Sequence, residues 1–476
     1  MNRIIIFTAL YLSMITAAFA GGTATITVHV TDKNLLKQSL TLVLLKEYLH
    51  GDVGAVETNL HADQNGYFRF KIADITRFKL FHLQFDRFRI MSNIIESGDQ
   101  LNIEFSGNEE SFVKAYCYQF SGRGSTKMEL WSKLRFERPR TVLNLYPIQP
   151  DDQSKLALLL SRADSIYAHK LKIVQSFKGK VSDNYYQYTL AESFGATYSE
   201  LFSFFIINKE FKLDSSKVSD LIDGAEKKRP KLNPDVISES EEYLKYLHLR
   251  SSSYVKYTYN TNRDKGFEAT YEDLIDRNTG LLREKVLLFF IAKDTRYRYS
   301  NNKNQVYHNA LRFMADKQHR QFIEEIALRR KTGSKAFDFS MSTVNGNTVH
   351  LQNFRNKVVM VECWFLGCES CIELAKKIKK TVLPAFINND EVVFLTINVD
   401  RPKQSWLTGL KRGDYTNSKS INLWTDGLGT NHPFLLHYQY HAMPQLMLID
   451  RKGNVVSTDI RGTGEEIVDK IRKALQ

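Results

Sequence analysis

The sequence predicts a multidomain protein with an N-terminal β-sandwich, a central α-helical region and a C-terminal α/β domain. Three observations lead to this prediction. Short apolar–polar alternations separated by turn signals fill the first part of the chain. Apolar residues at three- and four-residue steps fill the middle, and continuous apolar runs alternate with helical segments in the last part. The chain has 476 residues, 43% hydrophobic and 25% charged, which suits several globular cores.

Residues 1–20 have the features of a secretory signal peptide. Arg3 gives a basic start, an apolar run follows, and Ala18-Phe19-Ala20 places small residues before the expected cleavage site. The run is shorter than the about 20 residues of a spanning helix, although an uncleaved anchor is the alternative interpretation. We expect the protein to be exported, with no stable membrane insertion after signal cleavage.

The net charge and the cysteine count limit the expected partners and scaffold. A net charge of +13 is compatible with nucleic-acid binding. Export and the scattered positions of Lys and Arg argue against such a partner, so we expect no nucleic acid and a solvated basic surface. Four cysteines cannot form a disulfide framework for so long a chain. A closely spaced pair among them therefore points to chemistry rather than scaffolding.

Residues 21–112 are predicted to form the β-sandwich domain. In the stretch TATITVHV, Ile26, Val28 and Val30 alternate with polar residues, which is the period of a half-buried strand. Asn65-Gly66 and Gly98-Asp99 are turn signals between further short strands. Regular short strands of this kind are typical of a β-sandwich. We see no catalytic residues here and expect a binding or spacing module.

Residues 113–332 are predicted to form the α-helical domain. Apolar residues at helical spacing occur in four long segments, which are residues 151–177, 185–205, 281–294 and 308–331. The many Tyr and Phe residues in these segments are interpreted as packing residues.

Residues 333–476 are predicted to form the α/β domain. Gly333 and Ser334 interrupt the preceding helix, and Asn345-Gly346 predicts a hairpin turn. The run KVVMVECWF predicts a strand buried on both faces. Later segments predict, in order, a helix at 371–386, a strand at 391–400, a hairpin at 445–458 and a helix at 464–475.

The cysteine pair in WFLGCESC lies where the buried strand passes into the first helix of this domain. If Cys371 is helical, then Ala375, Ile378 and Val382 share its apolar face, so Cys371 points to the core. Cys368 lies at the first turn, where free N–H groups and the helix dipole favour a thiolate. We therefore expect Cys368 to be the exposed, activated thiol and Cys371 to be sheltered behind it.

Three stretches carry a resemblance to a known family. They are the lead FDFSMSTVNGNTVHLQNFRNKVVMVECWFLGCESC, the segment LTINVDRPKQSW, and HAMPQLMLIDRKGNVV, in which a proline precedes a hairpin. Residues 336–476 thus resemble the thioredoxin superfamily, and more closely its exported TlpA/ResA-like thiol–disulfide oxidoreductases.

The resemblance implies an enzyme that exchanges disulfides with protein substrates, with Cys368 as nucleophile and Cys371 as resolving cysteine. Pro444 matches the family's cis-proline, so Met443 and Pro444 are expected to form the wall where a substrate docks. Trp364 is also assigned to substrate contact. The partners implied are protein thiols or disulfides and an upstream redox protein, without a cofactor. The expected location is the periplasm, with envelope association left open.

Several residues depart from the family pattern or extend it. Gly367 replaces the usual Trp before the first cysteine, Ser370 replaces the usual Pro, and Glu369 places a negative charge beside the nucleophile. Glu362 lies six residues before Cys368, where thioredoxin has a buried Asp that assists proton transfer. A buried carboxyl has a raised pKa and could take the proton of Cys371, or it is a strand-end acid satisfied by a Lys or water.

The remaining cysteines and histidines are not assigned to the exchange chemistry, although His441 could line the rim of the site. Cys363 is interpreted as a core residue, and Cys117 has no visible partner. His432, His437 and His441 lack the usual spacing of metal ligands, so no metal site is predicted.

Three alternative functions stay open at this point. A peroxiredoxin is disfavoured because Phe365 stands where its Thr is expected. A copper chaperone pairs two cysteines, but with one more residue between them. An envelope binding or assembly module is the third alternative, because residues 23–332 show no site of their own.

Overall fold

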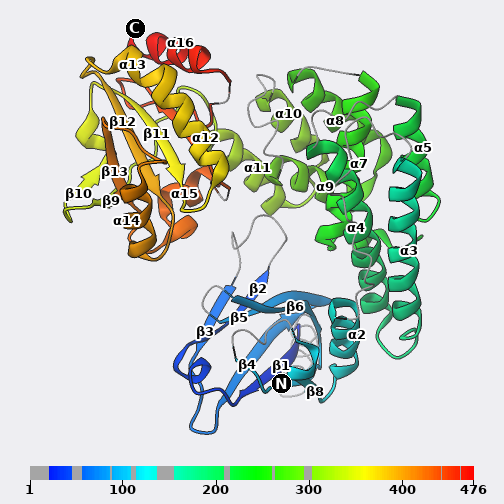
Figure 1. The fold of residues 1–476 in the computed structure, drawn as a ribbon. Helices are drawn as coiled ribbons and strands as arrows, with labels where there is room; N and C mark the ends of the chain where they lie inside the picture. Colours follow the sequence, from blue (N-terminus) through cyan, green and yellow to red (C-terminus); the bar gives the residue numbers. More distant parts are fainter. Residues whose placement is uncertain are drawn as a thin grey trace, which may run out of the picture. The chain divides into compact units, whose positions relative to one another are not determined.

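The computed structural model describes ten segments of the chain (Figure 1), which are residues 21–45, 56–85, 88–108, 114–136, 155–207, 215–259, 263–293, 303–440, 442–460 and 462–476. The predicted signal peptide and His441 lie outside the described residues. The chain divides into two compact units. The first is formed by Met1–Thr261 and Ala269–Lys293, and the second by Asn262–Glu268 and Asp294–Gln476.

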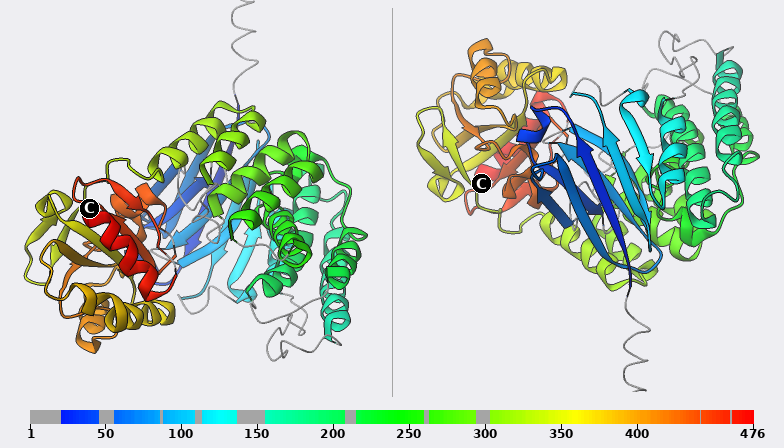
Figure 2. Two further views of the ribbon diagram at one scale, coloured as in Figure 1. Left: turned by 90° about the horizontal axis from the view of Figure 1, so that it is seen from above. Right: turned by 90° about the horizontal axis from the view of Figure 1, so that it is seen from below.

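The first unit begins with a β-sandwich, as predicted. Its strands are β1 (Gly22–Val30), β2 (Leu40–Leu45), β3 (Val56–Leu60), β4 (Tyr67–Ile75), β5 (Phe78–Phe85), β6 (Phe88–Glu96), β7 (Gln100–Phe105) and β8 (Tyr118–Ser121). In the described residues they form two four-stranded sheets, ordered β4-β1-β7-β8 and β3-β2-β5-β6. The strands of the two sheets, in blue and cyan, can be followed from two sides in Figure 2.

Alternation of side chains explains why the sheets pack face to face. Ile26, Val28 and Val30 of β1 are fully buried or nearly so, and they join Phe81 and Leu83 of β5 in one core. A core that takes inward residues from both sheets is what defines a sandwich. Strand β8 lies beyond the predicted boundary at residue 112 and still pairs with β7.

Helices follow the sandwich, in agreement with the predicted helical region. They are α2 (Ser125–Phe136), α3 (Lys155–Gln175), α4 (Asp183–Ile207), α5 (Ser215–Glu226), α6 (Pro234–Ile237), α7 (Glu241–Tyr259), α8 (Arg263–Arg277), α9 (Gly280–Lys293), α10 (Lys303–Ala310) and α11 (Lys317–Arg329). The aromatic residues are packing residues, as expected. Phe194 of α4 meets the ring of Tyr246 in α7 edge-on at 4.8 Å between centroids.

The helix predicted over 308–331 is two helices in the structure. A short 3₁₀ turn follows α10, and α11 begins after Asp316, whose carboxylate accepts the N–H groups of Gln318 and His319. An Asp that caps two backbone donors ends the apolar periodicity locally and starts a new helix. Within the described segments, no helix combines the length and apolar character needed to cross a membrane.

The second unit contains the predicted α/β domain. Its elements after α11 are β9 (Ser340–Thr343), β10 (Thr348–His350), β11 (Val358–Trp364), α12 (Glu369–Lys377), α13 (Leu383–Phe386), β12 (Val392–Asn398), α14 (Lys403–Arg412), β13 (Ser420–Trp424), α15 (Pro433–Tyr438), β14 (Gln445–Ile449), β15 (Val455–Ser457) and α16 (Gly464–Leu475). The described strands form one sheet, ordered β10-β9-β13-β12-β11-β14-β15.

Strand β11 lies inside this sheet and separates two cores. It runs parallel to β12 and antiparallel to β14. Val359, Val361 and Cys363 point to the core beneath α15, whereas Val358 and Met360 point to the core beneath α13 and α16. All seven residues of β11 are buried, which explains the continuous apolar run in the sequence.

Candidate active site

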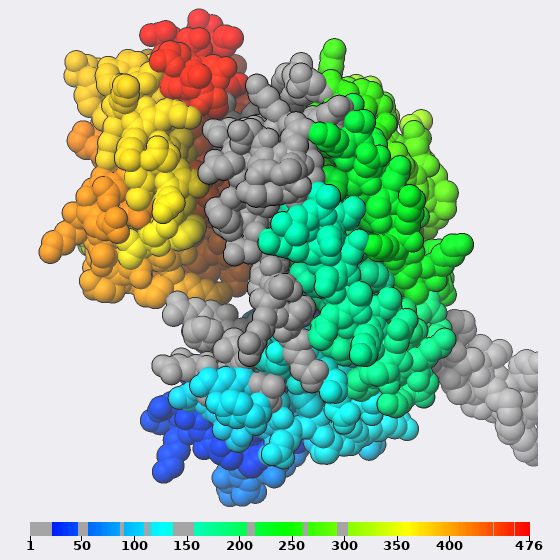
Figure 3. Space-filling model, turned by 45° about the vertical axis from the view of Figure 1, so that its right-hand side comes forward, coloured from blue at the N-terminus to red at the C-terminus, as the bar shows by residue number. Residues whose placement is uncertain are grey.

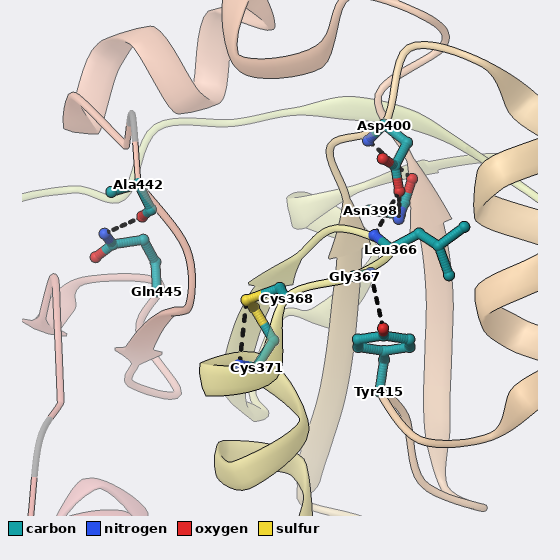
Figure 4. Close-up of a disulfide and its surroundings, with 9 residues drawn as sticks. All are labelled: Leu366, Gly367, Cys368, Cys371, Asn398, Asp400, Tyr415, Ala442 and Gln445. Carbon is teal, nitrogen blue, oxygen red and sulfur yellow. Dashed lines mark hydrogen bonds between the residues drawn. A yellow bond between two sulfur atoms is a disulfide. The ribbon is translucent and has the colours of Figure 1, made fainter. Parts of the chain in front are cut away.

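The two cysteines of WFLGCESC lie at the end of β11 and the start of α12, as predicted. Cys368 is the N-cap residue of α12, and it is joined by a disulfide to Cys371 in the first turn (Figure 4). The structure therefore holds the oxidised form of the pair. The apolar face behind Cys371 is the predicted one, because Ala375, Ile378 and Val382 are all buried.

The two cysteines differ less in exposure than the sequence indicated. Cys368 is 5% exposed and Cys371 is 0% exposed. The prediction of an exposed Cys368 is thus wrong for the oxidised protein, although its order relative to Cys371 holds. The reason is packing, since the sulfur of Cys368 is bonded to Cys371 and both residues join an aromatic cluster with Trp406 and Tyr415.

The start of the helix offers a hydrogen bond to the first sulfur. The backbone N–H of Cys371 donates to Sγ of Cys368 at 3.1 Å. A free N–H at a helix N-terminus and the positive end of the helix dipole both stabilise a thiolate at the N-cap position. Glu369 opposes this stabilisation in the same turn. The arrangement favours Cys368 as the ionising thiol of a reduced pair.

The turn before Cys368 is held by side chains that sequence reasoning missed (Figure 4). The N–H of Leu366 donates to the Asp400 carboxylate at 2.8 Å, and the N–H of Gly367 donates to the Tyr415 hydroxyl at 2.9 Å. Asn398 also donates to the Asp400 carboxylate, at 2.8 Å. Asp400 lies within the quoted LTINVD segment, but no local pattern linked it to a turn 34 residues earlier.

Gly367 is explained by the backbone of the same turn. Its φ angle is +93°, which lies in the region that side chains with a Cβ rarely adopt. The departure from the family's usual Trp is therefore matched by a local backbone that favours glycine.

Trp364 is not placed to contact a substrate, which corrects its assignment. Its side chain is 0% exposed. Its ring stacks on Tyr415 with 4.5 Å between centroids and an interplanar angle of 8°, and Gly409 lies against its outer edge. Because successive side chains of a strand point to opposite faces, Trp364 points away from the core that holds Cys363 and is buried under α14. It packs beneath the turn that precedes Cys368.

Met443 and Pro444 are the residues expected to form the docking wall. The peptide bond between them is cis, and Met443 packs, partly buried, against the cluster that contains both cysteines. Figure 4 shows the neighbouring Ala442 and Gln445 across from the disulfide, joined by a hydrogen bond. A partly exposed Met beside the disulfide provides an adaptable apolar surface.

Glu362 is buried without a full set of partners. It is 2% exposed, and its Oε1 atom has no hydrogen-bond partner. Burial raises its pKa to about 8, while the charge of Lys379 acts to lower it. It shares its face of β11 with Val358 and Met360, which is the face covered by the helical segment that follows Cys371.

The other cysteines and histidines that were considered as candidates and that the structure describes are buried, cap a helix or stack on an aromatic ring. Burial, with a contribution from Glu362, raises the pKa of Cys363 well above the usual range, so this thiol stays protonated. Cys117 is buried in the sandwich core. His432 caps α15 through the N–H of Phe434, and His437 stacks on Phe337. Among the residues that the structure describes, no group of His, Cys, Asp and Glu is arranged to hold a metal ion.

Lys376 of α12 lies on the outer side of this helix. Lys376 pairs with Glu373 at 2.9 Å, and both side chains are largely exposed. The yellow surface in Figure 3 belongs to this part of the chain.

Comparisons with known proteins found one family model and several similar solved structures for the C-terminal part of the chain. The family model described as Redoxin matches residues 331–475. Similar solved structures include the thioredoxin domain of a thiol-disulfide oxidoreductase from Bacteroides vulgatus, which is 25% identical, with 31% of this chain and 99% of that chain covered and a TM-score of 0.27. A thiol:disulfide interchange protein from Bacteroides sp. is also 25% identical, with 30% and 90% covered and a TM-score of 0.26. No curated protein matches the chain. Residues 331–475 thus match the Redoxin family model, and the similar solved structures over this part of the chain include thiol–disulfide oxidoreductases.

Proposed function

We propose that the chain is a periplasmic enzyme that exchanges disulfides with protein substrates through Cys368 and Cys371. The observation that carries the proposal is the disulfide between the N-cap of α12 and its first turn, with the N–H of Cys371 directed at the Cys368 sulfur. The location rests on the signal-like residues 1–20.

In the reducing direction, the Cys368 thiolate attacks one sulfur of a substrate disulfide. That S–S bond breaks, one substrate thiolate leaves, and a mixed disulfide forms with Cys368. Cys371 then loses its proton and attacks the Cys368 sulfur, which releases the second substrate thiolate. The substrate gains two electrons and the enzyme pair becomes the disulfide seen here. An upstream redox protein must return those electrons for another cycle.

Two further residues support the exchange in this proposal. Glu362, with a pKa of about 8, exchanges its proton near neutral pH, as a group that takes the proton of Cys371 must. Met443, which packs against the cluster that contains both cysteines, and the adjoining Pro444 form the wall against which a substrate chain docks.

The test is a trapping experiment in periplasmic extract. Cys371→Ser leaves the nucleophile in place but removes the attack that releases the substrate, so mixed disulfides on Cys368 are expected to accumulate. The matched control is Cys368→Ser, which should capture nothing. Wild-type protein should reduce insulin in the presence of a thiol reductant. If Cys371→Ser captures no protein and the wild type leaves insulin oxidised, the proposed exchange is wrong.

A further inference from the structure

The turn that leads into Cys368 is held by hydrogen bonds to side chains far away in the sequence. The N–H of Leu366 donates to Asp400, which follows β12, and the N–H of Gly367 donates to Tyr415, which follows α14. These bonds join a turn whose residues are partly or fully exposed to two side chains from other parts of the domain, so they constrain the position of its backbone.

The two acceptors are themselves firmly held. The Asp400 carboxylate also accepts Nδ2 of Asn398, and the backbone N–H of Asp400 donates to Oδ1 of Asn398 at 3.0 Å. Tyr415 is 0% exposed, and its ring stacks on Trp364, the residue that ends β11. Asp400 is therefore held by Asn398 of β12, and Tyr415 is held by Trp364 of β11, independently of their contacts with the turn.

The position of this turn decides where the Cys368 sulfur lies. The N–H of Cys368 closes the turn onto the Phe365 carbonyl at 3.3 Å, and its sulfur then lies 3.1 Å from the N–H of Cys371. In the oxidised protein the disulfide maintains this geometry. After reduction no covalent bond does so, and the anchored turn acts with the helical hydrogen bond from the N–H of Ile372 to the Cys368 carbonyl to keep the sulfur at the helix N-terminus.

We propose that Asp400 and Tyr415 are positioning residues that hold residues 366–367, so that the reduced Cys368 sulfur stays on the N–H of Cys371. The relevance of this inference to catalysis rests on the proposed exchange. The positioning of the Cys368 sulfur in the reduced protein does not depend on it. Asp400 and Tyr415 stabilise the thiolate form of Cys368 without contacting its sulfur. They thereby raise the rate at which Cys368 attacks a disulfide.

The first test compares two tyrosine variants of the full-length reduced protein. Tyr415→Phe removes the hydroxyl that accepts Gly367 and keeps the ring on Trp364. The matched control is Tyr438→Phe, because the Tyr438 hydroxyl also accepts a backbone N–H, from Phe337 at 2.8 Å, in another part of the same domain. The readout is the alkylation rate of Cys368 by iodoacetamide as a function of pH, with the modified residue identified by mass spectrometry.

Tyr415→Phe should raise the pKa of the Cys368 thiol and slow its alkylation below that pKa by about fivefold, the factor for one ordinary hydrogen bond. Tyr438→Phe should leave both unchanged. The assignment of Tyr415 is overturned if the two variants give the same alkylation profile.

The second test separates hydrogen bonding from charge at Asp400. Asp400→Asn removes the charge but keeps an oxygen that can accept Leu366 and Asn398, whereas Asp400→Ala removes the acceptor as well. Both variants are neutral at this position, so their difference reports the hydrogen bonds. Alkylation of Cys368 should be slower in Asp400→Ala than in Asp400→Asn, and equal rates would refute the role of Asp400. This pair decides the question even if Tyr415→Phe does not fold.

The two proposals can fail separately. Loss of insulin reduction and trapping in the wild type, with the alkylation pattern intact, would reject protein disulfide exchange and keep the positioning role. Normal exchange by the wild type, with equal alkylation rates in the Tyr415 and Asp400 variants and their controls, would keep protein disulfide exchange and reject the positioning role.

Discussion

Two buried ionisable side chains, one in each compact unit, have opposite surroundings. In the first, Lys127 of α2 is 5% exposed, and its ammonium group contacts both Glu96, at 2.9 Å, and Asp99 at the turn between β6 and β7. In the second, Glu362 is as deeply buried but has an oxygen without a partner. A paired buried charge fastens a helix to a sandwich, whereas an unpaired carboxyl has a pKa near working pH and suits proton transfer.

The largest effect is expected from unpairing the buried charges of the sandwich. Lys127→Met leaves Glu96 and Asp99 without their shared cation, which should lower the free energy of unfolding by about 3 to 5 kcal/mol. The reactivity of Cys368 should not change. Urea unfolding with hydrogen exchange followed separately in the two units measures the loss. Lys376→Met, at the exposed pair with Glu373, is the control and should behave as wild type. A sandwich as stable as the wild type would mean that Lys127 is not a fastening residue.

The second effect concerns the pH dependence of stability in the other unit. The folded protein keeps the Glu362 proton up to about pH 8, whereas an unfolded Glu releases it near 4.5. The stability contributed by this group is therefore complete below pH 4.5 and is lost as the pH rises toward 8. Glu362→Gln should remove this loss, so its stability relative to wild type should increase by a few kcal/mol over that range. Glu373→Gln, the same substitution at an exposed position, is the control and should show the wild-type dependence of stability on pH. If Glu362→Gln also showed the wild-type dependence, the Glu362 carboxyl would be ionised in the folded protein and the prediction would be wrong.

The same substitution should slow the second step of exchange. Without a carboxyl to take the Cys371 proton, release of a substrate from the mixed disulfide should be at least about tenfold slower near pH 8, while formation of the mixed disulfide keeps its rate. Rapid-quench kinetics with a labelled peptide disulfide separates the two steps. Equal slowing of both steps would indicate a structural role for Glu362 instead.

The smallest effect is expected at the neighbouring buried thiol. Cys363 lies on the opposite face of β11 from Glu362, in the core beneath α15, and burial keeps its thiol protonated. Cys363→Ala should cost about 1 kcal/mol of stability for a small core cavity and leave trapping and insulin reduction unchanged. Denaturant titration and the insulin assay together check this, and lost turnover in a folded variant would contradict it.

The parts of the fold that the sequence predicted well are those with a local cause. Strand β11 is a continuous apolar run, and the face behind Cys371 repeats at helical spacing, so both could be placed without tertiary contacts. The helix predicted over 308–331 was divided because the capping of α11 by Asp316 outweighs a continuing apolar pattern. The exposure of Cys368 and the role of Trp364 were mispredicted for one reason, since both depend on which distant aromatic residues cover the turn.

The sequence by itself determined the order of strand-rich, helical and α/β regions along the chain, the position of the cysteine pair at a strand–helix junction, and the burial of Glu362. These follow from periodicity and from the order of residues along a few turns of chain. Only the tertiary structure decided that Asp400 and Tyr415 hold the turn before Cys368 and that Trp364 packs beneath it. Such contacts join residues tens of positions apart, and no local preference specifies them, because they form only when the sheet and α14 bring those residues together.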